Sequence, residues 1–227
     1  EKQGGSDVGA NDVRAEPTDR EDIYRLYGEK WFCSNIDSSA ALVLARRPDA
    51  PSGTEGLSLF LLDRTTDDGE PNDMEYRRLK DKLGTKSVPT GEIEFEGAEA
   101  SLVGEPECGF KYMSEMLNVE RLYNAVGSIA AIGRSLLEAE VHAANREVFG
   151  DRLLEQPLMQ RDLTDMAVDH EAATAVTFEA AAQFDERERK VAEGIQDSDA
   201  QALMRILVPI AKYRTARMAV DTASYAM

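Results

Sequence analysis

The segment LNVERL, residues 117–122, holds a carboxylate in a position suited to a general base. Glu120 follows Met116 by four residues and Leu117 by three, and these spacings bring side chains to one face of a helix. A carboxylate beside an apolar stripe either finds a partner or has its pKa raised by desolvation, and a raised pKa suits proton abstraction near neutral pH. The alternative is a Glu at the edge of the stripe whose carboxylate reaches solvent.

Two stretches in the first half of the chain hold residue types that bind ligands. GGSDVG, residues 4–9, offers backbone N–H groups free of side-chain bulk, such as those that bind phosphate oxygens. It lacks the spacing of GxGxxG or GxxxxGK[ST], so a surface loop is the alternative. KWFCSN, residues 30–35, places two aromatic residues beside a hydroxyl. Strand alternation predicts that Trp31 and Phe32 point to opposite faces, one into the core and one into a pocket, unless both pack against the sheet.

Residues 145–150, NREVFG, are predicted to end a long helix, with Gly150 as its terminator. Arg146 would interact favourably with the negative end of the helix dipole. Of the two histidines, His170 is predicted to be a core residue with its polar atoms satisfied. His142 is predicted to be solvated or near a helix end.

The composition limits the kinds of partner and site that this protein can have. Of 227 residues, 43 are acidic and 26 basic, which gives a formal charge of −17. A field of that sign repels phosphate groups, so we expect neither a nucleic acid nor a membrane as partner. No apolar run approaches the roughly 20 residues of a membrane span and no signal peptide is visible, so the cytoplasm is the expected compartment. Cys33 and Cys108 lie far apart without CxxC spacing, which predicts two reduced thiols and no metal site.

The first 108 residues show the patterns of β-strands. Residues 23–34, IYRLYGEKWFCS, suggest a hairpin with aromatic-rich arms about a Gly-Glu turn. Four further strands are predicted between turn-rich segments, at residues 40–47, 57–64, 74–80 and 91–98. Apolar and acidic residues alternate strictly in GEIEFEGA, so one face of that strand should be buried. These patterns predict an antiparallel β-barrel or sandwich as the first domain, residues 1–108.

From residue 109 the apolar period becomes helical. The segment 110–148 contains no proline and carries an apolar stripe of Met113, Met116, Leu117, Ile129, Ile132 and Leu136. A second helix should begin near Pro157, and its seam consists of Leu163, Met166, His170, Ala173, Thr177, Ala180 and Phe184. A third should begin at the capping residues of DSDAQALM and be kinked by Pro209. The fold class is therefore α+β, with three long antiparallel helices of an incomplete four-helix bundle over residues 109–227.

Taken together, these segments resemble the acyl-CoA dehydrogenase family in sequence and in order. EKQGGSDVGA is similar to the end of the family's Glu-x-x-x-Gly-Ser-Asp loop, and YGEKWFCSN to its Gly-x-Lys-x-aromatic-x-Thr/Ser-Asn strand. KDKLGTKSVPTGEIEFEGAEA resembles the stretch that closes the family's β domain. LNVERLYNAVGSIAAIGRSL and ANREVFGDRLLEQPLMQ resemble two segments of its C-terminal helical domain. LKDKLG and QPLMQ are similar to the branch that includes the bacterial alkylation-response protein.

The resemblance implies that the chain is the middle β domain and the first part of the C-terminal domain, with flavin adenine dinucleotide (FAD) bound between them. Gly5 and Ser6 would contact FAD, and Ser6 would also lie near the coenzyme A end of the substrate. The flavin ring would be flanked by Phe32 and Ser34, with Cys33 in contact through its backbone.

The C-terminal half would contribute to FAD bound by a neighbouring subunit of a homodimer or homotetramer. The residues that would reach it are Arg146, Val148 and Phe149. The family's cofactor-binding Gln aligns with Pro157, and Gln156 stands beside that position.

The implied reaction is α,β-dehydrogenation of an acyl-CoA thioester, with electron-transferring flavoprotein as the acceptor. Asn118 and Arg121 would lie at the substrate site. Glu120 occupies the position of the α-proton base of the isovaleryl and long-chain members, whereas most members use a Glu further along the chain. A fragment of this extent is expected to be inactive alone. The alternative function is a flavin-binding alkylation-stress protein with weak or no dehydrogenase activity.

Overall fold

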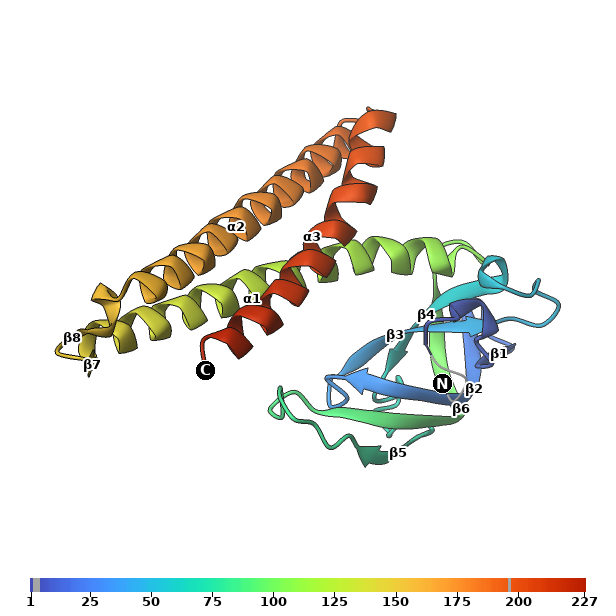
Figure 1. Cartoon of the computed structure of the whole chain (residues 1–227). Helices are drawn as coiled ribbons and strands as arrows, with labels where there is room; N and C mark the ends of the chain where they lie inside the picture. The colour runs from blue at the N-terminus through green and yellow to red at the C-terminus, as the bar shows by residue number, and fades with distance from the viewer. Residues whose placement is uncertain (2–4, 196) are drawn as a thin grey trace. The chain divides into compact units, whose positions relative to one another are not determined.

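The computed structural model describes residues 1, 5–195 and 197–227, which form two compact units. The first unit comprises residues 1–115 and the second residues 116–227. Figure 1 shows strands in the first unit and long helices in the second. The predicted order of a β domain followed by three helices is confirmed.

The described residues of the first unit form six strands. They are β1 Arg14–Pro17, β2 Ile23–Ser34, β3 Ala40–Arg46, β4 Leu57–Asp63, β5 Met74–Leu79 and β6 Thr90–Val103. Neighbouring strands follow the order β2-β1-β3-β4-β6-β5, and β2 also pairs with β6, which closes a barrel-like ring. The pairings are antiparallel except for the contact of β1 with β3. Closure leaves no free edge between β2 and β6, and β5 extends the ring along β6.

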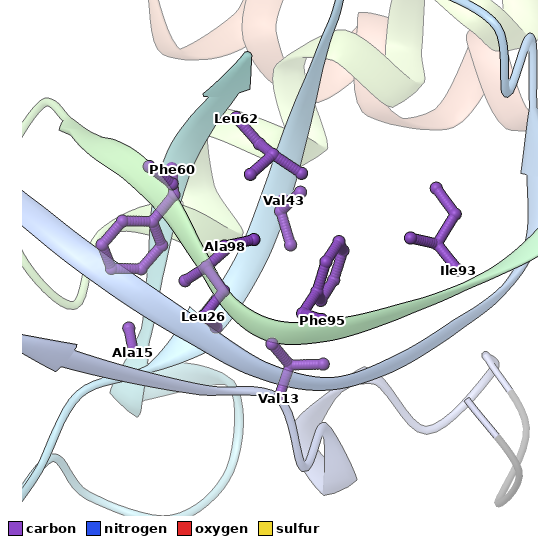
Figure 2. Close-up of a cluster of buried hydrophobic side chains, with 11 residues drawn as sticks. Val13, Ala15, Leu26, Val43, Phe60, Leu62, Ile93, Phe95 and Ala98 are labelled. Atoms are coloured by element: carbon purple, nitrogen blue, oxygen red, sulfur yellow. The ribbon is translucent and has the colours of Figure 1, made fainter. Parts of the chain in front are cut away.

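The barrel core consists of alternating side chains from these strands (Figure 2). Phe60 and Leu26 are fully buried, and the ring of Tyr24 meets that of Phe60 edge-on, with the centroids 5.1 Å apart. On β6, Ile93 and Phe95 are buried while Glu96 is exposed, which confirms the predicted alternation. Figure 2 shows Phe60, Leu26, Val43 and Phe95 gathered between the strands.

The predicted hairpin over residues 23–34 is wrong, because β2 is one strand that pairs with β6 from Ile23 to Ser34. Gly28 does not form a turn. Its φ is +127°, and a Cβ at this position would lie 3.2 Å from the Cα of Val13. Glycine is therefore required here by its φ and by the close approach of another backbone segment.

Three helices build the second unit, namely α1 Gly109–Asn145, α2 Pro157–Ala192 and α3 Ser198–Tyr225. The first residues of α1 belong to the β unit, where Tyr112 and Met113 pack against a small cluster around Leu57. Pro157 is at the first position of α2, as predicted. Asp197 caps α3 by accepting hydrogen bonds from the backbone N–H groups of Asp199 and Ala200. Pro209 lies within α3, which bends along its length in Figure 1.

The three helices pack through small and medium apolar side chains. Ala125 of α1 and Ala180 of α2 form one cluster with Met204 and Val208 of α3. The predicted seam of α2 is confirmed, since its buried residues are Leu163, Met166, Ala173, Thr177 and Ala180.

His170 is half-buried against Gly133 of α1, and His142 is exposed. Within the described residues, no helix combines the length and apolarity needed to cross a membrane.

Candidate functional site

The described part of the predicted cofactor loop begins at residue 5 with a turn, which leads into a short 3-10 helix, Val8–Ala10. Gly4 lies outside the described residues, whereas Gly5 and Ser6 are exposed in a turn. Among the residues that the structure describes, a Cβ on Gly5 would meet nothing within 4 Å. An open backbone of this kind leaves room for a ligand to approach closely.

The far end of this loop is held by Arg46, a residue that the sequence patterns did not single out. Its guanidinium donates hydrogen bonds to the carbonyl oxygens of Gly9 at 2.9 Å and Gly53 at 3.0 Å, and also to that of Pro51. A Cβ on Gly9 would lie 3.1 Å from the Cα of Gly53. The two turns therefore pack backbone to backbone, and Arg46 satisfies carbonyl groups of both.

A β-bulge in β2 determines the position of Phe32. Lys30 pairs with Ile93 and Cys33 with Gly91, so two residues of β2 oppose one residue of β6. Phe32 has a φ of +57° and is 57% exposed. The ammonium of Lys80 lies 4.1 Å from the centroid of its ring. A bulge changes the direction of side chains, which is why simple alternation does not apply here.

The prediction that one of the two aromatics enters the core is wrong. Trp31 is half-buried, and within the described part of the chain neither ring belongs to a hydrophobic core cluster. The rings of Trp31 and Phe32 meet edge-on, with centroids 6.1 Å apart. An exposed aromatic at a bulge with positive φ is a strained arrangement typical of ligand sites.

The next two residues of β2 differ in burial. Cys33 is a free, half-buried thiol packed against the barrel core, and burial raises its pKa. Ser34 is exposed and pairs with Thr90 at the start of β6. The strand therefore presents Phe32 and Ser34 to solvent and turns Cys33 inward.

The second unit brings together Asn118 and Arg121, the two predicted substrate residues. The guanidinium of Arg121 donates a hydrogen bond to the amide oxygen of Asn118 at 3.0 Å. Glu120 is exposed, and Met116, one turn earlier, is 48% exposed. This part of the predicted apolar stripe is therefore exposed in the chain. The exposure of Glu120 agrees with the alternative in which its carboxylate reaches solvent, and its role as a base stays a prediction.

The segment after α1 is a small hairpin rather than a helix end with a glycine terminator. The helix ends at Asn145, and β7 Glu147–Val148 pairs with β8 Asp151–Arg152. Phe149 and Gly150 lie between these two strands, and their φ values of +56° and +94° are positive, as a type I′ turn requires. The predicted role of Gly150 is wrong because its positive φ is used in this two-residue turn.

This hairpin displays an aromatic side chain at its tip. Phe149 is 98% exposed, and the carbonyl oxygen of Arg146 accepts a hydrogen bond from the N–H of Leu153 at 2.7 Å, which closes the base. Gln156 follows a 3-10 turn, Leu153–Glu155, and is the half-buried N-cap residue of α2. The predicted contact residues Arg146, Val148, Phe149 and Gln156 thus lie within one short connection.

Family models match both units of this chain. The acyl-CoA dehydrogenase middle domain matches residues 1–98, and the acyl-CoA dehydrogenase C-terminal domain matches residues 107–227. The chain therefore belongs to the acyl-CoA dehydrogenase family.

Individual relatives agree with this assignment. The chain is 40% identical to acyl-CoA dehydrogenase family member 11 of Caenorhabditis elegans over 99% of its length, and 39% identical to AidB of Escherichia coli over 94%. The crystal structure of C. elegans ACDH-11 in complex with C11-CoA matches with a TM-score of 0.89 at 36% identity over 100% of this chain. The chain spans 36% and 37% of the two curated relatives and 38% of the solved chain.

Proposed function

We propose that the protein containing this chain catalyses the FAD-dependent α,β-dehydrogenation of an acyl-CoA thioester. The observation that carries the proposal is the pair of exposed aromatics, Phe32 and Phe149, each held at positive φ within a family motif. Residues held in strained backbone conformations cluster at ligand-binding sites. Family membership supplies the class of ligand.

The residues of the first unit fit a flavin cofactor. Gly5 offers backbone with no obstacle from the described part of the chain, as close approach to a pyrophosphate requires. Phe32 offers an aromatic face and Ser34 a hydroxyl, both accessible to solvent. We assign Gly5, Ser6, Phe32, Cys33 and Ser34 to FAD, with Ser6 also near the substrate. Bound FAD supplies the two-electron acceptor for the hydride that leaves the β-carbon of the substrate.

Glu120 is assigned as the base that takes the α-proton. The electron pair of the broken Cα–H bond then forms the double bond as hydride leaves the β-carbon. The carboxylate is exposed in this chain, so the dry surroundings that favour proton abstraction must come with the substrate, which expels water on binding. The bonded pair of Asn118 and Arg121, on the same turn of α1, would orient the thioester ligand.

We assign the hairpin after α1 to contacts with the FAD that a second copy of the chain binds. Phe149, Arg146 and Val148 would contact FAD held by the partner in a homodimer or homotetramer, and Gln156 would contribute to the same site. Electron-transferring flavoprotein is the proposed acceptor of electrons from the reduced cofactor. The family resemblance supports both assignments.

The test is product formation by the full-length protein. The purified protein, loaded with FAD, is given straight-chain and branched acyl-CoA thioesters together with an artificial electron acceptor. We expect a 2,3-enoyl-CoA, two mass units lighter than its substrate, from at least one of them. Absence of any enoyl-CoA from an FAD-loaded protein would contradict the proposal.

A second candidate is a flavin-binding alkylation-response protein with weak or no dehydrogenase activity. The 39% identity to AidB over 94% of the chain favours it. This candidate predicts FAD binding without enoyl-CoA formation from any thioester. The product assay therefore separates the two functions.

Phe149→Ala should weaken FAD binding without changing stability. The side chain is 98% exposed, so its removal is expected to leave the unfolding midpoint of the apo protein unchanged. Loss of a buried ring contact across the subunit interface should raise the FAD dissociation constant roughly 10- to 100-fold. Fluorescence titration with FAD measures this effect. Phe178→Ala, an exposed Phe on α2, is the control, and equal FAD affinities in the two variants would contradict the assignment.

A further inference from the structure

Both ends of the segment that carries Gly5 and Ser6 are tied to a single side chain of β2. The ammonium of Lys30 lies 2.5 Å from a carboxylate oxygen of Glu1 and donates a hydrogen bond to the amide oxygen of Asn11 at 2.6 Å. Glu1 precedes the segment and Asn11 follows it. The side chains of Lys30 and Glu1 are only 20% and 7% exposed, and Asn11 is buried.

The partners of Lys30 are themselves anchored. The second carboxylate oxygen of Glu1 accepts a hydrogen bond from the N–H of Asp12 at 2.7 Å. The side-chain amide of Asn11 donates to the carbonyl oxygen of Leu44 on β3 at 2.9 Å. The cluster therefore connects Glu1 and Asn11, which lie on either side of Gly5 and Ser6 in the sequence, to two strands of the barrel.

A buried ion pair is a poor source of net stability, because desolvation of both charges offsets their attraction. Such a pair is better suited to fixing one geometry, since each charge must keep its partner. Burial lowers the pKa of Lys30, and the Glu1 carboxylate opposes that effect. The other titratable groups that face the ammonium are Asp12 and Cys33.

We infer that Lys30 is a positioning residue for the cofactor loop. Through Glu1 and Asn11 it fixes the segment that carries Gly5 and Ser6 to β2, the strand that carries Phe32 and Ser34. This inference rests on the proposed FAD binding. It assigns to the lysine of the strand motif a role at the cofactor site without direct contact with the cofactor.

The test uses Lys30→Met in the full-length protein, with Lys86→Met as the control. Lys86 is an exposed lysine of the same unit. We expect Lys30→Met to raise the FAD dissociation constant roughly 10- to 100-fold, the effect of losing hydrogen bonds to a charged group. In the apo protein it should also accelerate hydrogen exchange at the amides of residues 10–12 by a larger factor than it accelerates exchange within β4, which follows global stability. The control should change neither quantity.

A second variant separates positioning from stability. Lys30→Met alone leaves the Glu1 carboxylate buried without its cation, which is destabilising. Adding Glu1→Gln removes that charge, so the double variant should recover the unfolding midpoint of the wild type. FAD affinity should stay weak in the double variant, because the link between Glu1 and Lys30 is still missing. Recovery of FAD affinity together with stability would overturn the positioning role.

The pH dependence gives a further readout. FAD affinity requires the charged ammonium in this account, and a lowered pKa means that Lys30 loses its proton at a lower pH than an ordinary lysine. Affinity should therefore fall as pH rises, beginning below the usual lysine pKa of about 10.4. Lys30→Arg, which stays protonated, should bind FAD with no such alkaline decrease. The same alkaline decrease in both proteins would contradict the role of Lys30.

The outcomes distinguish this inference from the proposed function. If the wild type does not bind FAD, the proposed function is wrong, and the exchange experiment alone then decides whether Lys30 anchors the segment. If the wild type binds FAD but Lys30→Met changes neither exchange nor affinity, the inference is wrong and the proposed function stands.

Discussion

Glu120→Gln is expected to slow the reduction of bound FAD by an acyl-CoA by about two to four orders of magnitude. A positioned general base typically contributes this much, and an amide cannot accept the α-proton. Glutamine keeps the shape of the side chain, and Glu120 is exposed, so stability and FAD content should stay at wild-type values. Anaerobic stopped-flow measurement of the flavin absorbance gives the rate.

Glu140→Gln is the matched control, because Glu140 is another exposed glutamate on α1. It should reduce its flavin at the wild-type rate. If Glu120→Gln also does so, Glu120 is not the base, and a glutamate elsewhere in the full-length protein has that role.

Phe60→Ala should cost about 3–5 kcal/mol in free energy of unfolding, the range for removing a fully buried Phe. Phe60 has no exposed surface and pairs with Val43 across β3 and β4 (Figure 2). Its ring contacts the ring of Tyr24 edge-on. A cavity at this position would loosen the barrel whose strands hold the cofactor residues. Denaturant unfolding followed by circular dichroism measures the change.

Leu42→Ala provides the comparison within the same barrel. Leu42 lies on β3 next to Val43 but is 56% exposed, so its truncation should change the free energy of unfolding by about 0.5 kcal/mol or less. Similar losses in the two variants would mean that the barrel core is not packed as described. A large loss of unfolding free energy in Phe60→Ala, with a small loss in Leu42→Ala, would support the described packing.

Local patterns predicted the elements that depend on local chemistry. The alternation in β6, the seam of α2, Pro157 at the first turn and the Asp197 cap are each encoded within a few residues, and the structure confirms them. The short strand β1 has only four residues and was not predicted, although it closes the barrel between β2 and β3.

The features that were missed depend on residues far apart in the chain. The local pattern around Gly28 predicts a turn, because the approach of the Val13 backbone is not visible in that pattern. The bulge that exposes Phe32 arises from the register between β2 and β6, some 60 residues away. Lys30 and Glu1 are separated by 29 positions, so their pairing also could not be predicted locally. The hairpin at Phe149 was hidden because Phe-Gly is a less typical type I′ turn than Asn-Gly or Asp-Gly.

The most direct test of the proposed function is the absorbance of the bound flavin when the full-length, FAD-loaded protein is mixed anaerobically with acyl-CoA thioesters of different length and branching. Transfer of two electrons from substrate to cofactor must bleach that absorbance. The proposed function predicts bleaching by at least one thioester, with the matching enoyl-CoA as product. An FAD-loaded protein whose absorbance stays unchanged with every thioester would contradict it.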